Sequence, residues 1–79
     1  MTTAIKQNDI GIRINVTHTA AGTVYYAFNG GPETALTDND YLVLSAIHTA
    51  KRGINHITFI EKTGTTRITS DDVFEFEVV

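Results

Sequence analysis

Serine, histidine and acidic residues are the first candidates for chemistry in this chain of 79 residues, which has three histidines and no cysteine. Ser45 and His48 lie three residues apart and would share one face of a helix, so their side chains could touch. Nucleophilic catalysis also needs an oriented base and an oxyanion hole, and the sequence carries no Gly-x-Ser-x-Gly turn or other catalytic signature. We therefore predict that the protein is not an enzyme.

Metal ions have few candidate ligands in this sequence. The three histidines are spread along the chain without a His-x-x-x-His spacing, and the absence of cysteine removes thiolate ligands. Asp38-Asn39-Asp40 resembles a calcium loop only superficially, because the alternating spacing, the central glycine and the distal glutamate are missing. We predict neither a metal nor a cofactor.

The glycine-rich segment Asn29-Gly30-Gly31-Pro32 has two interpretations. Glycine most often serves backbone geometry, which favours a connector between elements. Exposed amide groups in such a loop could instead contact an anionic ligand. Under the second interpretation the candidate ligand-binding residues are Arg13, Tyr25, Asn29, Gly30 and Gly31.

A line of polar residues forms the other candidate site. Tyr41, Ser45, His48 and Arg52 are spaced by four, three and four residues, which places them along one face of a helix. Tyrosine and arginine often carry binding energy at interfaces, and a histidine could add a dependence on pH. We expect either a partner-binding surface or an ordinary solvated helix face.

The elements that position these residues begin with a predicted hairpin. Apolar residues alternate over residues 10–19 and again over 23–29, and Ala20-Ala21-Gly22 between them suits a three-residue hairpin loop. Pairing the two segments across this loop sets apolar residues opposite one another on one face, for example Ile14 opposite Phe28.

A helix is predicted over residues 37–53. Thr37 is a suitable N-cap, Lys51 and Arg52 complement the negative end of the helix dipole, and Gly53 lies where the helix should stop. Six apolar residues cover one broad side of the helical projection: Leu42, Val43, Leu44, Ala46, Ile47 and Ala50. We expect that side to pack on a sheet.

The last third of the chain is predicted to be strand. Residues 54–70 are typical of a hairpin that turns at Thr63-Gly64 with Lys62 opposite Thr65, and residues 73–79 follow as a strand with its phenylalanines inward.

The element order β-β-α-β-β-β predicts a single α+β domain over residues 1–79. Its two layers would be an antiparallel sheet of about five strands and one helix packed on one face. The other face and both edges of the sheet would be bare, and a chain this small has no disulfide to stabilise it. We therefore expect a homo-oligomer.

Charge and hydropathy limit the classes of partner that the protein could bind. Six basic residues oppose nine acidic ones, for a net charge of −3, and the basic residues form no patch, which argues against nucleic acid. Residues 61–79 carry the whole net charge of −3; this acidic end could meet a basic partner, or Glu75 and Glu77 could simply form the solvent-exposed face of a strand. No apolar run reaches the length of a membrane span and no signal peptide is recognisable, so we expect a cytoplasmic protein that binds no membrane.

Three functions remain after these exclusions. The first is a non-enzymatic binding protein that occupies a partner protein. The second is a homo-oligomer that binds or sequesters a small anionic, nucleotide-like ligand, and the third is a structural subunit of a viral assembly. The profile of the chain (short, acidic, cysteine-free, without a catalytic signature and complete from its own Met) resembles that of small phage accessory proteins. This resemblance to a type of protein assigns no residues; it favours binding over catalysis, of the kind phages use to inhibit host defence factors, and a viral protein of this kind would act in the host cytoplasm.

Overall fold

A computed structural model describes residues 3–19, 21–36, 40–69 and 71–79. Its elements in chain order are β1 (Thr3–Ile5), β2 (Arg13–Asn15), β3 (Thr23–Phe28), β4 (Thr34–Ala35), β5 (Tyr41–Val43), α1 (Ala46–Thr49), β6 (Gly53–Thr63), β7 (Thr66–Arg67) and β8 (Asp72–Val78). Strands dominate this part of the chain, and its one helix has four residues. The predicted two-layer α+β fold is therefore wrong. No helix in the described ranges has the length and apolar character that crossing a membrane would require.

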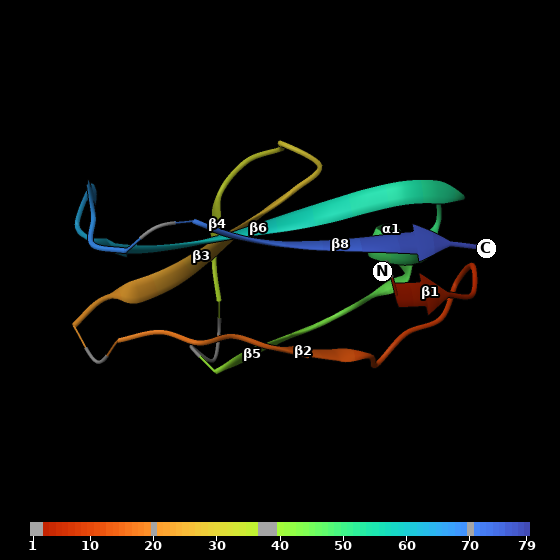
Figure 1. Ribbon diagram of the computed structural model, residues 1–79, viewed down its shortest axis with the longest axis horizontal. Helices are drawn as coiled ribbons and strands as arrows, with labels where there is room; N and C mark the ends of the chain where they lie inside the picture. Colours follow the sequence, from red (N-terminus) through yellow and green to blue (C-terminus); the bar gives the residue numbers. More distant parts are fainter. Residues whose placement is uncertain (1–2, 20, 37–39, 70) are drawn as a thin grey trace.

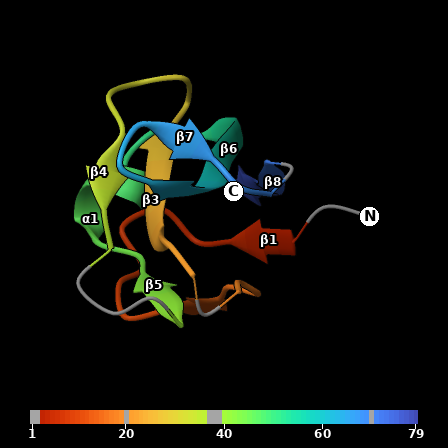
Figure 2. The same cartoon turned by 90° about the vertical axis from the view of Figure 1, so that its left-hand side faces the viewer.

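The strands form two sheets that enclose one core (Figure 1). The large sheet has the order β1-β8-β6-β3-β4, with β7 also paired to β6, while β2 and β5 form a separate two-stranded ribbon. β1 runs parallel to β8 and the other pairs are antiparallel, so the sheet is mixed rather than purely antiparallel. The ribbon lies beside one face of the large sheet (Figure 2). Ile14 and Leu42 of the ribbon, and Leu44 directly after β5, belong to the buried cluster that also contains Ile57 and Phe76.

The helix predicted over residues 37–53 is mostly wrong. In the described part of this segment, residues 40–53, the structure has the strand β5 followed by the four-residue helix α1. Leu42 and Leu44 are 7% and 1% exposed, whereas Val43 between them is 45% exposed and Ile47 is 73% exposed. Burial on every second residue is the period of a strand, and a helix with one broad apolar side would have buried all four residues.

Pairing with β2 explains why this segment is extended. Leu42 lies opposite Ile14, and the backbone N–H of Leu44 donates to the carbonyl oxygen of Ile12 at 2.8 Å. The ribbon thereby buries both leucines and satisfies their backbone groups, a tertiary gain that outweighs local helix propensity. The residues predicted as the helix start, 37–39, lie outside the described residues.

The predicted first hairpin has the wrong partner strand. Ile14 is buried, as its alternation predicts, but β2 pairs with β5, and Phe28 of β3 lies opposite Ile57 of β6. Alternation fixes which side chains point inward and does not fix which strand lies alongside, so the apolar match between the two segments was not diagnostic. Residue 20 of the predicted loop lies outside the described residues.

β3 instead forms a hairpin with β4. Asn29 and Gly30 have φ angles of 51° and 75°, and the N–H of Gly31 donates to the carbonyl oxygen of Phe28 at 2.9 Å. Two consecutive left-handed residues, with glycine in the second position, are typical of a type I′ turn.

The C-terminal strands follow the sequence more closely. β6 and β7 turn at Gly64, but Lys62 lies opposite Arg67 rather than opposite Thr65. On β8, Phe76 and Val78 are fully buried, which confirms the predicted inward face.

Candidate functional site

A cavity of about 310 Å³ opens between the connection from β2 to β3 and the neighbouring ends of β6 and β8. Its apolar lining consists of Val16, Val24, Phe59 and Ile60. Its polar lining consists of Thr17, His18, Thr19, Glu61, Thr69 and Asp72. Apolar walls with a few convergent polar groups, at this volume, are typical of small-molecule sites. This hollow is named the His18–Glu61 cavity below.

Strand register explains why two carboxylates lie beside the apolar wall of this hollow. Val24 lies opposite Glu61, and Phe59 lies opposite Asp72, so these four side chains share the inward face of the large sheet. Glu61 continues the inward row of β6, and Asp72 begins the inward row of β8. Pairing between β6 and β8 stops at Asp72, and pairing between β6 and β7 resumes only at Lys62, so the cavity lies beside this break in the ladder.

Glu61 anchors the connection from β2 to β3 to the sheet. Its side chain is buried, and its carboxylate accepts hydrogen bonds from the backbone N–H of Thr19 at 2.9 Å and from the Thr19 hydroxyl at 2.5 Å. The Thr19 hydroxyl oxygen in turn accepts from the N–H of Ala21 at 3.2 Å. These donors, the Thr19 hydroxyl first, hold the pKa of Glu61 below its ordinary value, so the carboxylate is ionised at neutral pH.

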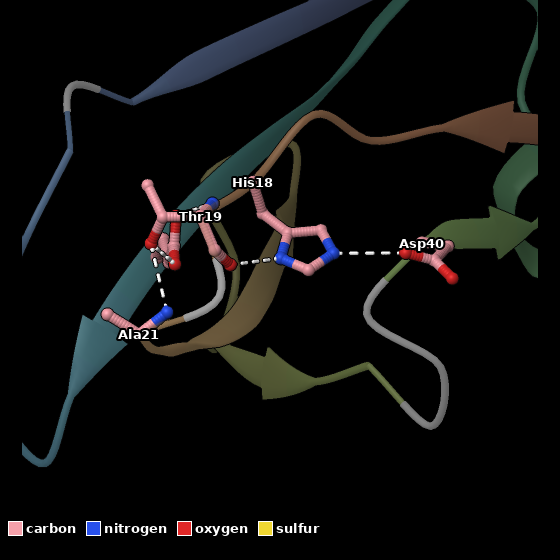
Figure 3. Close-up of polar contacts among 5 residues, drawn as sticks. His18, Thr19, Ala21 and Asp40 are labelled. Carbon is pink, nitrogen blue, oxygen red and sulfur yellow. Dashed lines mark hydrogen bonds and ion pairs between the residues drawn. The ribbon is translucent and has the colours of Figure 1, made fainter.

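His18 joins the same connection to the ribbon (Figure 3). Its Nε2 lies 3.0 Å from a carboxylate oxygen of Asp40, and its Nδ1 contacts the backbone carbonyl oxygen of Thr19. Both partners are acceptors, so the doubly protonated ring satisfies both at once. The bond to Asp40, followed by the bond to Thr19, raises the pKa of His18 above its ordinary value. Both ring nitrogens of His18 are thus occupied by acceptors of the fold, which disfavours a role as a general base.

Three polar side chains in the lining are left to interact with a ligand. Thr17, Thr69 and Asp72 are exposed residues at the mouth of the cavity, and their side chains have no hydrogen-bond or ion-pair partner among the described residues. Asp71 differs from its neighbour, because its carboxylate lies 3.4 Å from the guanidinium Nε of Arg67. The cavity therefore combines a wall fixed by hydrogen bonds with a rim of uncommitted acceptors and hydroxyls.

A second hollow of about 470 Å³ lies between β3, β4 and β5. Its lining includes Tyr26, Leu36 and Tyr41 and has no charged side chain among the described residues. Because no charged side chain among the described residues lines it, we assign it no role.

The residues predicted to line one helix face do not share a helix. Tyr41 belongs to β5, where the guanidinium of Arg13 lies 4.0 Å from its ring centroid. Arg52 follows α1 and donates from Nε to the side-chain oxygen of Gln7 at 3.0 Å. The continuous line of four side chains therefore does not form, and any partner-binding role of these residues stays a prediction.

Ser45 and His48 do contact each other, as their spacing predicts. The backbone N–H of Ser45 donates to Nδ1 of His48 at 3.0 Å, and the Ser45 hydroxyl oxygen lies 3.3 Å from the same nitrogen. The His48 ring is buried against Phe28, with 5.1 Å between centroids, and burial lowers the pKa of His48. A neutral histidine that accepts at Nδ1 caps the start of α1, and this contact needs no catalytic role.

The predicted ligand-binding residues are dispersed over the fold. Arg13 lies on the ribbon, whereas Tyr25 lies on the outward face of β3, where the Lys62 ammonium is 4.6 Å from its ring centroid. These two residues therefore belong to different sheets.

Asn29, Gly30 and Gly31 form the type I′ turn rather than an open loop. The Asn29 amide nitrogen donates to the side-chain oxygen of Asn55 at 2.9 Å, and its oxygen accepts from the N–H of His56 at 2.8 Å. Both functional groups of this side chain thus serve the fold.

The residues of the His18–Glu61 cavity were missed as a site, although the sequence holds a signal for them. His18 shares the alternating inward face of residues 10–19, and Glu61 falls in phase with the apolar row of the strand from residue 54. A charged group in phase with a buried row indicates either a satisfied network or a site.

No family model matches the chain, and no curated protein or solved structure matches it. Among the described residues, no group of three or more histidine, cysteine or acidic side chains could hold a metal ion. The site's own geometry is therefore the basis for a functional proposal.

Proposed function

We propose that this protein is a non-enzymatic binding protein that holds a small molecule in the His18–Glu61 cavity. The observation that carries the proposal is a cavity of about 310 Å³ with apolar walls, next to three polar side chains that have no partner among the described residues. The wall is held in place before any ligand arrives, because Thr19 is bonded to Glu61 and His18 is bonded to Asp40. A preformed site loses less conformational entropy when it binds.

Two features support binding over catalysis. Acceptor oxygens of Thr19 and Asp40 lie against both ring nitrogens of His18, so both nitrogens are occupied by contacts within the fold. The Thr19 hydroxyl donates to a carboxylate whose pKa is lowered, and a more acidic carboxylate is a weaker base. The sequence left open an anionic ligand at Arg13, Tyr25 and Asn29–Gly31 as an alternative, whereas this cavity lies elsewhere and is lined by two carboxylates, Glu61 and Asp72.

A fragment screen read by ligand-observed NMR and thermal shift tests the proposal. A ligand that binds only the native state raises the melting temperature. Thr69→Trp should block the cavity rim and abolish the hits, whereas Thr66→Trp, at an exposed site outside the lining, should retain them. A library that yields no hit, or hits that survive Thr69→Trp, would overturn the proposal.

A partner protein is the second candidate. Ile54 and Val73 are 59% and 60% exposed on the outward faces of β6 and β8, and exposed Glu75 and Glu77 lie between and beside them. Apolar side chains with an acidic border suit a basic partner, and the phage-type inhibitor of a host factor in the cytoplasm belongs to this candidate. Homo-oligomers and viral assemblies would use the same face.

Size-exclusion chromatography with light scattering and a pull-down test this second candidate. Ile54→Asp should abolish an interaction on this face. Ile10→Asp, at a residue that is 67% exposed outside it, should not. If Ile54→Asp and Ile10→Asp give the same oligomeric state and the same pull-down, the face around Ile54 and Val73 is not the interface.

A further inference from the structure

The charge of the His18–Glu61 cavity identifies the chemical class of its ligand. Two of its described lining residues, Glu61 and Asp72, carry carboxylates, and His18 is the one basic side chain among them. The positive charge of His18 is already paired with Asp40 at 3.0 Å, outside the lining. The electrostatic potential in the cavity is therefore negative, and a negative potential repels anions and attracts cations.

The two carboxylates differ in what they can offer a ligand. Both oxygens of Glu61 accept hydrogen bonds from Thr19, so this group is committed to the fold. Asp72 is exposed at the mouth of the cavity and has no side-chain partner among the described residues, and the cation nearest in sequence, Arg67, forms ion pairs with Asp71 and Glu33. A carboxylate that lines an apolar hollow without a partner is a ready acceptor for a charged donor.

Strand register places this acceptor beside an apolar floor. Asp72 occupies the first inward position of β8, in the row that continues with Phe74 and Phe76. Its cross-strand neighbour is Phe59, which is buried in the cavity wall. An acidic group at the end of an aromatic row complements a molecule that has one charged end and one apolar end, and an ammonium near an aromatic ring gains further attraction.

We infer that the ligand is a small organic cation, with its ammonium group bonded to the Asp72 carboxylate and its apolar body against Val16, Val24 and Phe59. The hydroxyls of Thr17 and Thr69 accept the remaining ammonium hydrogens. This inference rests on the proposed small-molecule function and adds the charge and shape of the ligand to it.

Matched probes test the inference on the full chain. Phenethylammonium and 2-phenylethanol share an apolar body and differ in the charge of the end group. Binding is followed by the methyl NMR shifts of Val16, Val24 and Ile60. Phenethylammonium should bind more tightly than 2-phenylethanol, and a high concentration of sodium chloride should weaken the binding of phenethylammonium only.

Asp72→Asn should lower the affinity for phenethylammonium about two- to fivefold, the range for an exposed charge pair. It should leave the affinity for 2-phenylethanol unchanged. Asp9→Asn removes the same charge at an exposed site outside the lining and should leave both affinities unchanged. The salt dependence of the unaltered protein decides the question if Asp72→Asn fails to fold.

The outcomes separate the two proposals. Equal affinity for the two probes, together with no salt dependence, would overturn the cation inference and leave the small-molecule function standing. If neither probe shifts the cavity methyl signals and the wider screen yields no hit, both the cation inference and the small-molecule function are overturned.

Discussion

Replacing Leu44 by alanine measures directly whether a ribbon or a helix forms the second layer. Leu44 is 1% exposed in the core between the ribbon and the large sheet, whereas Ile47 is 73% exposed. In the predicted helix both residues lie on the same apolar side, so both truncations would be costly. In the observed fold, Leu44→Ala should lower the free energy of unfolding by about 2–5 kcal/mol, the usual cost of emptying a core leucine site. Ile47→Ala should change it by about 0.5 kcal/mol or less.

Urea and thermal denaturation, followed by circular dichroism, give both values. For a chain of this size each 1 kcal/mol shifts the melting temperature by roughly 4–8 °C, so Leu44→Ala should melt at least about 8 °C below the unaltered protein. Ile47→Ala is the matched control because it removes a side chain of the same size. Comparable losses in the two variants would refute the ribbon and restore the helix.

Further predictions concern the groups that hold the cavity wall and one buried amide. Because the pKa of His18 is raised on folding, its stabilising contribution is full below its ordinary pKa and is lost as pH rises through the folded value. Asp40→Asn should reduce that pH dependence of the unfolding free energy and lower the pKa of His18 seen by NMR. The pKa of Glu61 is lowered, so its contribution is full above its ordinary pKa and is lost as pH falls through the folded value. Glu61→Gln should flatten the acid limb of the stability profile, and an unchanged limb would contradict its role. Asn55 is 1% exposed and bonded to Asn29, so Asn55→Ala should cost about 1–3 kcal/mol in urea denaturation by leaving buried polar groups unpaired.

Local pattern in the sequence was sufficient for strands whose burial alternates. The inward placement of Ile14 and Phe76 follows from period two, and both residues are buried. Asn29-Gly30 held an unused signal, because this dipeptide strongly favours a two-residue hairpin turn. The following Pro32 and the second glycine made the segment look like a loop.

Which strands pair, and which elements form the second layer, depended on contacts between residues far apart in the sequence. Leu42 is buried by lying opposite Ile14, which is 28 positions earlier in the chain. The cavity needed the same information, since Thr19 meets Glu61 across 42 residues. The charged residues could be placed on an inward face from the sequence, but only the long-range register brings them to one hollow.

Methyl NMR titration of the protein with the fragment hits tests the central claim most directly. The account predicts saturable shifts centred on the methyl groups of Val16, Val24 and Ile60, and their loss in Thr69→Trp. Shifts spread evenly over the surface, or centred on the exposed Ile54 and Val73, would contradict a ligand site in the His18–Glu61 cavity.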